Sequence, residues 1–209
     1  MSLYTPRHFA VEGEAEARAL IRAHPFATLI TSTAGEPHVT HLPLLLDDDG
    51  TLTGHMARAN PHWQAFEAGH TLAIFHGPHA YITPNWYVDP TSEVPTWNYA
   101  AVHAHGQPEL IDDPAAKLAV VDGTSAVFES PAAPWTRQVE GSRLAALLDA
   151  IVVFRWQPTR LEAKFKMNQN KTPADRAQVI AYLRASGHPD HVAMADWMSR
   201  HALPPPTLP

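Results

Sequence analysis

Cysteine is absent from this 209-residue sequence, and so is any long hydrophobic run. Without cysteine, disulfide bonds, thiolate metal sites and a cysteine nucleophile are excluded. No apolar stretch approaches the roughly 20 residues of a membrane helix, and residues 1–9 lack the apolar segment of a signal peptide. Basic residues are also scarce, because 15 Lys and Arg face 21 Asp and Glu. We therefore expect a soluble cytoplasmic protein without general attraction to nucleic acid or anionic membranes.

The composition is otherwise that of a globular protein, with 45% hydrophobic residues, enough for one domain with a sizeable core. Histidine (14) and proline (20) are abundant. The prolines favour short elements joined by defined turns. The histidines could form metal or heme sites, for example at His103 and His105. A metal site needs three or more convergent ligands, however. The histidine pairs of this sequence are spread over different strands and have few acidic residues nearby.

Hydrophobic periodicity and turn residues predict the elements of the chain. Strands are predicted at residues 26–33, 38–46, 51–57, 71–76, 79–83, 96–106 and 151–156, with a turn at Gly77-Pro78 between the fourth and the fifth. Helices are predicted at residues 12–24, 61–68, 114–129, 142–149, 173–185 and 190–201, with Asp113 and Thr172 as N-caps. Strands in hairpins, followed by inserted helices, predict a mainly β fold of the α+β class: an antiparallel barrel with helical additions.

Residues 94–106 form the most informative of these strands. Side chains of a strand alternate between its two faces. One face holds Asn98 and small apolar residues, which suit a packed interior. The other holds Trp97, Tyr99, Ala101, His103 and His105, a large flat surface that can form hydrogen bonds. Such a surface suits a partner subunit or a planar ligand. It could equally be covered by one of the chain's own helices.

Two further segments carry candidate binding residues. Asn60 and Pro61 are typical of a helix start, and the preceding Arg58 could join backbone N–H groups in an anion site, although Asn-Pro caps are common without ligands. Lys164 and Lys166 lie two apart and share a strand face. With residues 168–170, which are Asn, Gln and Asn, they form either a polar pocket for an anionic ligand or a solvated basic edge.

Seven blocks together carry a family resemblance: YTPRHF (4–9), HPFATL (24–29), HLPL (41–44), GHMARANP (54–61), FHGPHAYI (75–82), VPTWNY (94–99) and KFKMNQN (164–170). In this order they resemble the PaiB-like family, called FMN-binding negative transcriptional regulators. The resemblance covers residues 3 to about 186. It implies an antiparallel split β-barrel of the pyridoxamine-phosphate-oxidase-like kind with C-terminal helices. It also implies a homodimer with FMN at the subunit interface.

Cofactor-binding residues follow from the matched blocks of this family. They are His41, His55, Arg58, Asn60, Trp97, Asn98, Tyr99, Lys164, Lys166, Gln169 and Asn170. Their chemistry suits FMN: cations for the phosphate, amides for the pyrimidine edge and aromatic surface for the rings. Residues 1–170 are expected to form the split-barrel domain with its inserted helices. Residues 171–209 are expected to form a helical extension with a proline-rich tail.

The function implied by the resemblance is that of an FMN-binding negative transcriptional regulator. No basic helix-turn-helix is present and the net charge is −6, so direct DNA contact is not supported by charge. A flavin-dependent oxidoreductase acting on a small molecule is the alternative, although no dinucleotide fingerprint for NAD(P)H is found. Heme or metal binding through the histidines is the second alternative. We predict no metal among the site residues and leave the catalytic residues, if any, unassigned.

Overall fold

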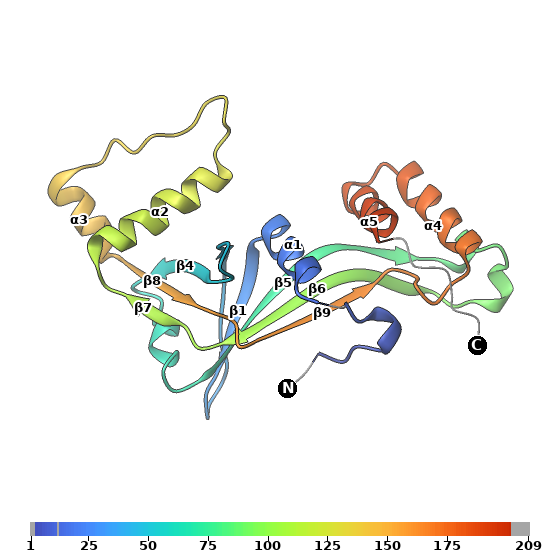
Figure 1. Ribbon diagram of the computed structural model, residues 1–209, viewed down its shortest axis with the longest axis horizontal. Coiled ribbons are helices and arrows are strands. Elements are labelled where there is room, and N and C mark those ends of the chain that lie inside the picture. Colours follow the sequence, from blue (N-terminus) through green and yellow to red (C-terminus); the bar gives the residue numbers. More distant parts are fainter. Residues whose placement is uncertain (1–2, 12, 202–209) are drawn as a thin grey trace. The chain divides into compact units, whose positions relative to one another are not determined.

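The computed structural model describes residues 3–11 and 13–201 (Figure 1). Its strands are β1 (Phe26–Ser32), β2 (His38–Pro43), β3 (Leu45–Leu46), β4 (Leu52–Ala57), β5 (His70–Ile82), β6 (Thr96–Gly106), β7 (Glu109–Ile111), β8 (Ile151–Trp156) and β9 (Arg160–Lys166). Its α-helices are α1 (Ala15–Ala23), α2 (Pro114–Phe128), α3 (Gly141–Asp149), α4 (Pro173–Ala185) and α5 (Pro189–Arg200). Short 3-10 helices are η1 (Arg7–Phe9), η2 (Pro61–Ala65), η3 (Pro84–Trp86) and η4 (Pro90–Ser92).

The strands form two sheets. The first has the order β2-β1-β5-β6-β9 and the second the order β3-β4-β8-β7. β1 pairs antiparallel with both β2 and β5, and β8 pairs antiparallel with both β4 and β7. The described part of the chain is thus antiparallel in these pairings, with α-helices inserted after β7 and after β9. Among the residues described, no helix has the length and apolar character that crossing a membrane requires.

Contacts between residues divide the chain into two compact units. Unit 1 comprises Met1–Ala17, His76–Val102 and Glu162–Pro209, and unit 2 comprises Arg18–Phe75 and His103–Leu161. The long strands β5, β6 and β9 contribute residues to both. The helices α4 and α5 belong to unit 1 and the helices α2 and α3 to unit 2. The boundary after residue 170 stays a prediction, and the predicted proline-rich tail at residues 203–209 lies outside the described residues.

In unit 1, α5 packs on the small-residue face of β6 and on β9. Phe165 of β9 meets Trp197 edge-on, with ring centroids 5.4 Å apart. The buried Asn98 points to the same helix, because its amide nitrogen lies 3.6 Å from the sulfur of Met198. The buried guanidinium of Arg176 donates to the carbonyl oxygens of Met198 and His201 and thereby closes the C-terminal end of α5.

Local signals predicted several elements correctly. Asp113 caps α2 by accepting from the backbone N–H of Ala116 at 2.7 Å, and Thr172 caps α4 by accepting from that of Asp175 at 3.1 Å. The strands predicted at 96–106 and 151–156 match β6 and β8. The alternation predicted for β6 also holds on one side, since Asn98 and the small residues that share its face are all buried.

Two strand predictions are wrong. Residues 38–46 do not form one strand. Leu44 lies between β2 and β3 and donates its N–H to the carbonyl oxygen of Pro25 at 2.9 Å, and β3 then pairs in the other sheet. The turn predicted at Gly77-Pro78 is also wrong, because β5 runs through it. The pairing with β1 ends at Phe75, so Pro78 lies where only β6 is a neighbouring strand, and there a missing N–H is tolerated.

The burial pattern of β5 changes phase at Gly77-Pro78. Alternate residues up to Phe75 are buried, both Gly77 and Pro78 are buried, and alternation then resumes with Ala80 and Ile82 buried. A one-residue shift of this kind is what a β-bulge produces. Its effect is to expose His79 and Tyr81 on the same face.

Candidate functional site

An aromatic surface of unit 1 is left open to solvent. Trp97 of β6 is 54% exposed and Tyr81 of β5 is 43% exposed. Their rings meet edge-on with centroids 6.0 Å apart, and the ring of His79 lies 6.2 Å from that of Trp97. Tyr99, two residues along β6, is half-buried on the same face. No helix of the described chain covers Trp97 enough to bury it, so the end of the predicted surface formed by Trp97 and Tyr99 remains available. The other end does not, because Ala101 and His105 are buried.

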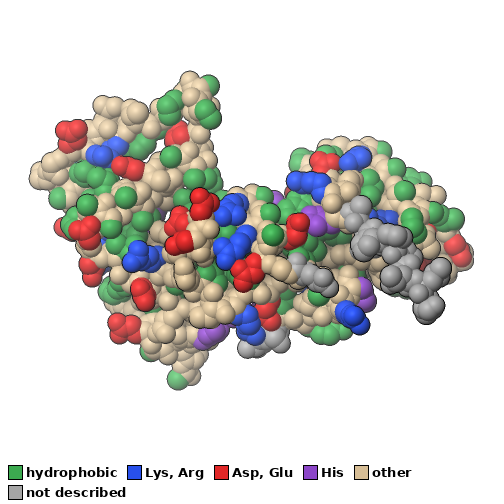
Figure 2. Space-filling view, in the orientation of Figure 1, with side chains coloured by type: hydrophobic (Ala, Val, Ile, Leu, Met, Phe, Trp, Pro, Cys, Tyr) green, Lys and Arg blue, Asp and Glu red, His purple; other side chains and the backbone are tan. Residues whose placement is uncertain are grey.

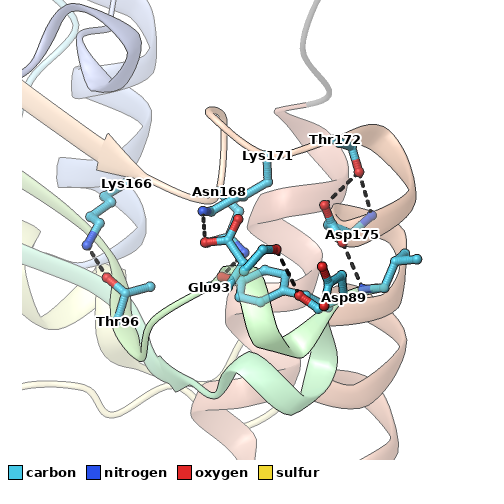
Figure 3. A network of polar contacts seen from close by, with 11 residues as sticks. Asp89, Glu93, Thr96, Lys166, Asn168, Lys171, Thr172 and Asp175 are labelled. Atoms are coloured by element: carbon cyan, nitrogen blue, oxygen red, sulfur yellow. Dashed lines mark hydrogen bonds and ion pairs between the residues drawn. The ribbon is translucent and has the colours of Figure 1, made fainter.

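Two lysines of β9 lie beside this surface. The ammonium of Lys164, which is only 8% exposed, donates to the carbonyl oxygen of Tyr4 at 2.8 Å. It also lies 5.2 Å from the ring centroid of Tyr4 and 5.4 Å from that of Tyr99. Lys166 donates to the hydroxyl of Thr96 (Figure 3). Together, Tyr81, Trp97, Tyr99, Lys164 and Lys166 are called here the aromatic–lysine face.

The positive charge on this face is not neutralised within unit 1. In residues 3–11 and 13–201, neither Lys164 nor Lys166 forms an ion pair with a carboxylate, whereas the nearby Lys171 pairs with Glu93. Burial lowers the pKa of Lys166, and the positive charges of Lys164 and Lys171 lower the pKa further. Partly desolvated cations without a counter-ion are costly, so an anion placed here would be stabilised.

A polar network fixes the segments that flank the face (Figure 3). Asn168 has a left-handed backbone with φ of 58°, which asparagine tolerates, and its amide donates to the hydroxyl of Tyr87 at 3.1 Å. Asp175 of α4 accepts from the backbone N–H of Val88 at 2.8 Å. With the pair between Lys171 and Glu93, these contacts tie the loop before β6 to the turn after β9.

The structure does not bring the three predicted amides onto the aromatic–lysine face. Asn98 lies on the opposite side of β6, against α5. Gln169 uses its side chain within its own turn, accepting from the N–H of Met167 at 2.6 Å and donating to the carbonyl of Phe165. Asn170 is exposed. Of the seven predicted residues in unit 1, Trp97, Tyr99, Lys164 and Lys166 therefore gather together.

The other four predicted residues lie in unit 2. Arg58 is exposed, and its guanidinium donates to the carbonyl oxygens of Asp149 at 2.6 Å and Ile151 at 3.0 Å, next to the end of α3. Asn60 caps η2 by accepting from the N–H of His62 at 3.1 Å. This element is a five-residue 3-10 helix, not the helix predicted over 61–68. Arg58 thus donates to the last residue of α3 and to the first residue of β8, and an anion site at this position stays a prediction.

His41 and His55 complete the predicted set. His41 is exposed on β2, with its Nδ1 atom 3.1 Å from the hydroxyl of Thr28 on the neighbouring strand. His55 is half-buried on β4 opposite Val153, and burial lowers its pKa. A neutral imidazole at His55 could serve as a hydrogen-bonding group, whereas it would contribute little positive charge toward a phosphate.

A histidine that is not among the predicted residues lies at the centre of a hydrogen-bond network. His62 is 1% exposed, and its two ring nitrogens lie 2.8 Å from the hydroxyl of Thr40 and 2.9 Å from that of Thr31. Burial, followed by the charge of His38, lowers its pKa to about 4. Only its position two residues after the Asn60 cap could have drawn attention to it, because its partners come from other strands.

Comparison with known proteins shows the family to which the chain belongs. The family described as "Putative FMN-binding domain" matches residues 3–160. "Protease synthase and sporulation protein PAI 2" of Bacillus subtilis (strain 168) is 34% identical over 202 residues, which cover 94% of this chain and 96% of that protein. The chain belongs to the PaiB-like FMN-binding-domain family. The resemblance seen in the seven sequence blocks is thereby confirmed.

Solved structures confirm the fold expected for a PaiB-like chain. The flavocytochrome Anf3 from Azotobacter vinelandii superimposes with a TM-score of 0.63 at 18% identity, over 83% of this chain and 78% of that one. The FAD and heme binding protein from Mycobacterium smegmatis superimposes with a TM-score of 0.61 at 15% identity, over 85% and 80%. At these identities the likeness shows the fold alone, and the prediction of an α+β split barrel is confirmed.

Proposed function

We propose that this PaiB-like protein binds FMN on the aromatic–lysine face of unit 1. The observation that carries the proposal is the pair of lysines without a carboxylate partner, next to exposed aromatic rings. A flavin phosphate is a dianion, which Lys166 and Lys164 would neutralise. An isoalloxazine is flat and largely apolar, which Trp97 and Tyr99 suit.

The residues of the face would bind and orient the cofactor. Lys166, which already donates to Thr96, retains further N–H donors for an anion. Trp97 offers ring surface that its contacts with Tyr81 and His79 hold in place. Bound flavin would supply redox chemistry, and no residue of the chain is assigned to a proton transfer.

A homodimer would place a second subunit over the exposed aromatic rings. Trp97 and Tyr81 expose about half of their surface, which suits a contact that closes over a planar ligand. We propose that the regulatory role implied by the family is indirect, through the flavin or a partner protein. The net charge of −6 gives no electrostatic support to tight DNA contact.

The second candidate function is that of a flavin-dependent oxidoreductase acting on a small molecule, which requires no contact with DNA. The two can be separated by the absorption spectrum of the purified, flavin-loaded protein after addition of NADH or NADPH. Bleaching of the oxidised flavin bands supports the oxidoreductase. Bands that persist support the regulator, and a salt-sensitive mobility shift of DNA would show that the regulation is direct rather than indirect.

The binding proposal itself is tested by flavin fluorescence during titration of cofactor-free protein. Lys166→Met should weaken FMN binding roughly 10- to 100-fold, since a charged hydrogen bond contributes about 1.5–3 kcal/mol. Arg184→Met is the matched control, because that cation of α4 has Asp196 as its own partner and is not part of the network beside the face. Riboflavin, which lacks the phosphate, should bind both variants equally. Equal FMN affinity of Lys166→Met and unaltered protein would remove the assignment.

A further inference from the structure

A cavity of about 520 Å³ lies in unit 2, where β8 ends and β7 begins. This volume is within the range of roughly 300–1,000 Å³ that is usual for small-molecule sites. Figure 2 shows both acidic and basic side chains at the surface around β7 and β8. The cavity is called here the Arg155 cavity, and its lining includes Asp49, Gln107, Glu109, Arg155, Trp156 and Gln157. These residues all belong to unit 2, whereas the aromatic–lysine face belongs to unit 1.

The charged groups of the Arg155 cavity do not neutralise one another. Arg155 lies directly opposite Glu109 in the antiparallel pairing of β8 with β7. Even so, within residues 3–11 and 13–201 the guanidinium forms no ion pair with Glu109 or with Asp49. Asp49 accepts from the backbone N–H of Thr51 at 2.9 Å. Hydrogen bonds from Thr51 lower the pKa of Asp49, and the positive charge of Arg155 lowers it further. One guanidinium and two ionised carboxylates are therefore available to a ligand.

A hydrogen-bond donor without a partner lies at the wall of the cavity. Trp156 is 4% exposed, and its indole N–H has no acceptor in the described part of the chain. A Cβ atom added at Gly106 would lie 2.8 Å from that nitrogen and 3.4 Å from the carbonyl oxygen of Gln157. The N–H edge of the indole is therefore close to the backbone at Gly106 and Gln157. A buried donor without an acceptor is costly, so an acceptor brought to this end of the cavity would be stabilised.

The side chain of Gln107 adds an oriented acceptor beside this donor. Its amide nitrogen donates to the carbonyl oxygens of Phe66 at 3.3 Å and Glu67 at 3.1 Å, which leaves its amide oxygen to accept from a ligand. A carboxamide group donates through its nitrogen and accepts through its oxygen. It is therefore complementary to the oxygen of Gln107 together with the N–H of Trp156.

The charges of the lining favour a small zwitterion. A guanidinium binds a carboxylate through two parallel hydrogen bonds, and a pair of carboxylates suits an ammonium group. A phosphorylated ligand would meet two negative groups for one positive group. A flat apolar ligand would find little surface, because Trp156, the one aromatic residue among the described residues of the lining, is buried.

We propose that the Arg155 cavity binds a free L-amino acid with a carboxamide side chain. Its α-carboxylate would lie on Arg155 and its ammonium group between Asp49 and Glu109. Its side-chain amide would reach Gln107 and the indole N–H of Trp156. This site goes beyond the flavin proposal and stands whether or not flavin binds, because the two sets of residues do not overlap.

Isothermal titration calorimetry of the full chain with L-glutamine and with L-asparagine tests the proposal. Arg155→Met should weaken binding of the amino acid roughly 10- to 100-fold, because a charge-assisted hydrogen-bonded pair is lost. Arg143→Met is the matched control and should bind as the unaltered protein does, since Arg143 is an exposed residue of α3 outside the lining. The proposal is overturned if neither amino acid binds at millimolar concentration, or if Arg155→Met binds as tightly as the unaltered protein.

A second variant distinguishes the two charged ends of the ligand. Glu109→Gln should weaken binding of L-glutamine but not of 4-carbamoylbutanoate, which is glutamine without its ammonium group. Arg155→Met should weaken both. A Glu109→Gln variant that loses the two ligands equally would contradict the assignment, because a general disturbance of the fold has that effect.

The indole of Trp156 gives a readout inside the cavity. In the ¹⁵N–¹H spectrum, the side-chain signal that is missing from Trp156→Phe should move downfield when L-glutamine is added. A signal that stays in place would refute the contact. FMN titration of Arg155→Met should match that of the unaltered protein. A loss of FMN affinity in this variant would assign the cavity to the flavin and overturn the amino-acid proposal.

Discussion

Acidification should destabilise the protein through His62. Its ring is 1% exposed and is enclosed by the hydroxyls of Thr31 and Thr40, with the ring of His38 stacked at 5.7 Å. In the unfolded chain the ring would take up a proton with a pKa near 6.5, whereas in the folded protein burial lowers that pKa to about 4. The unfolded state therefore binds more protons between these two values.

The sign and size of the effect follow from proton linkage. The contribution of the neutral ring is fully present above pH 6.5, declines as the pH falls, and stops declining below pH 4, where both states are protonated. The loss approaches about 1.4 kcal/mol per pH unit within this window. It amounts to about 2 kcal/mol at pH 5 and about 3 kcal/mol at pH 4. His24 and His55, whose pKa values burial also lowers, act in the same direction.

Urea unfolding followed by tryptophan fluorescence, at one protein concentration and several pH values, measures this loss. His62→Gln should be less stable at pH 7 and should lose less stability than the unaltered protein between pH 7 and pH 4.5. His41→Gln, at an exposed position of β2, is the control and should retain the full loss. A stability difference between the unaltered protein and His62→Gln that is constant over this pH range would refute the reasoning.

Three other substitutions test separate features. Arg58→Ala should lower stability by about 1 kcal/mol because the carbonyl oxygens of Asp149 in α3 and Ile151 in β8 lose their donor. FMN titration of the folded variant then decides whether Arg58 also binds the cofactor. Asn98→Leu should leave urea stability unchanged or raise it by up to about 1 kcal/mol, since its buried Oδ1 has no hydrogen-bond partner among the residues described; a loss above about 2 kcal/mol would contradict this. Gly106→Ala should cost about 1–3 kcal/mol, because the added carbon would lie 2.4 Å from Cδ1 of the buried Trp156, and Trp156→Leu should relieve much of that loss.

Much of the fold could be predicted because its signals are local. The Asp113-Pro114 and Thr172-Pro173 pairs start helices through caps that span three residues, and the alternation along β6 depends only on neighbouring residues. Gly77-Pro78 misled the prediction because proline is compatible with an extended backbone wherever no partner needs its N–H. Whether a neighbouring strand needs that N–H depends on where β1 ends, and the residues near Pro78 in the sequence do not indicate this.

The candidate site was predictable to a lesser degree. Spacing alone placed Lys164 with Lys166 and Trp97 with Tyr99 on shared faces, and the structure brings Lys164 to Tyr99. The same alternation placed Asn98 on the other face. The matched family block had grouped Asn98 with Trp97 and Tyr99, although these side chains lie on opposite faces of β6. The partners of Arg58 are 91 and 93 residues away in sequence, and no pattern near Arg58 indicates them.

Because of the phase change at Gly77-Pro78, odd-numbered residues of β5 are buried before it and even-numbered residues are buried after it. A deletion of Gly77 would restore one continuous alternation and move every later side chain of the strand to the opposite face. Tyr81 would then point toward the buried face of the strand, and Ala80 and Ile82 would point outward. Single-residue insertions and deletions should therefore be tolerated least around Gly77-Pro78, in the middle of β5.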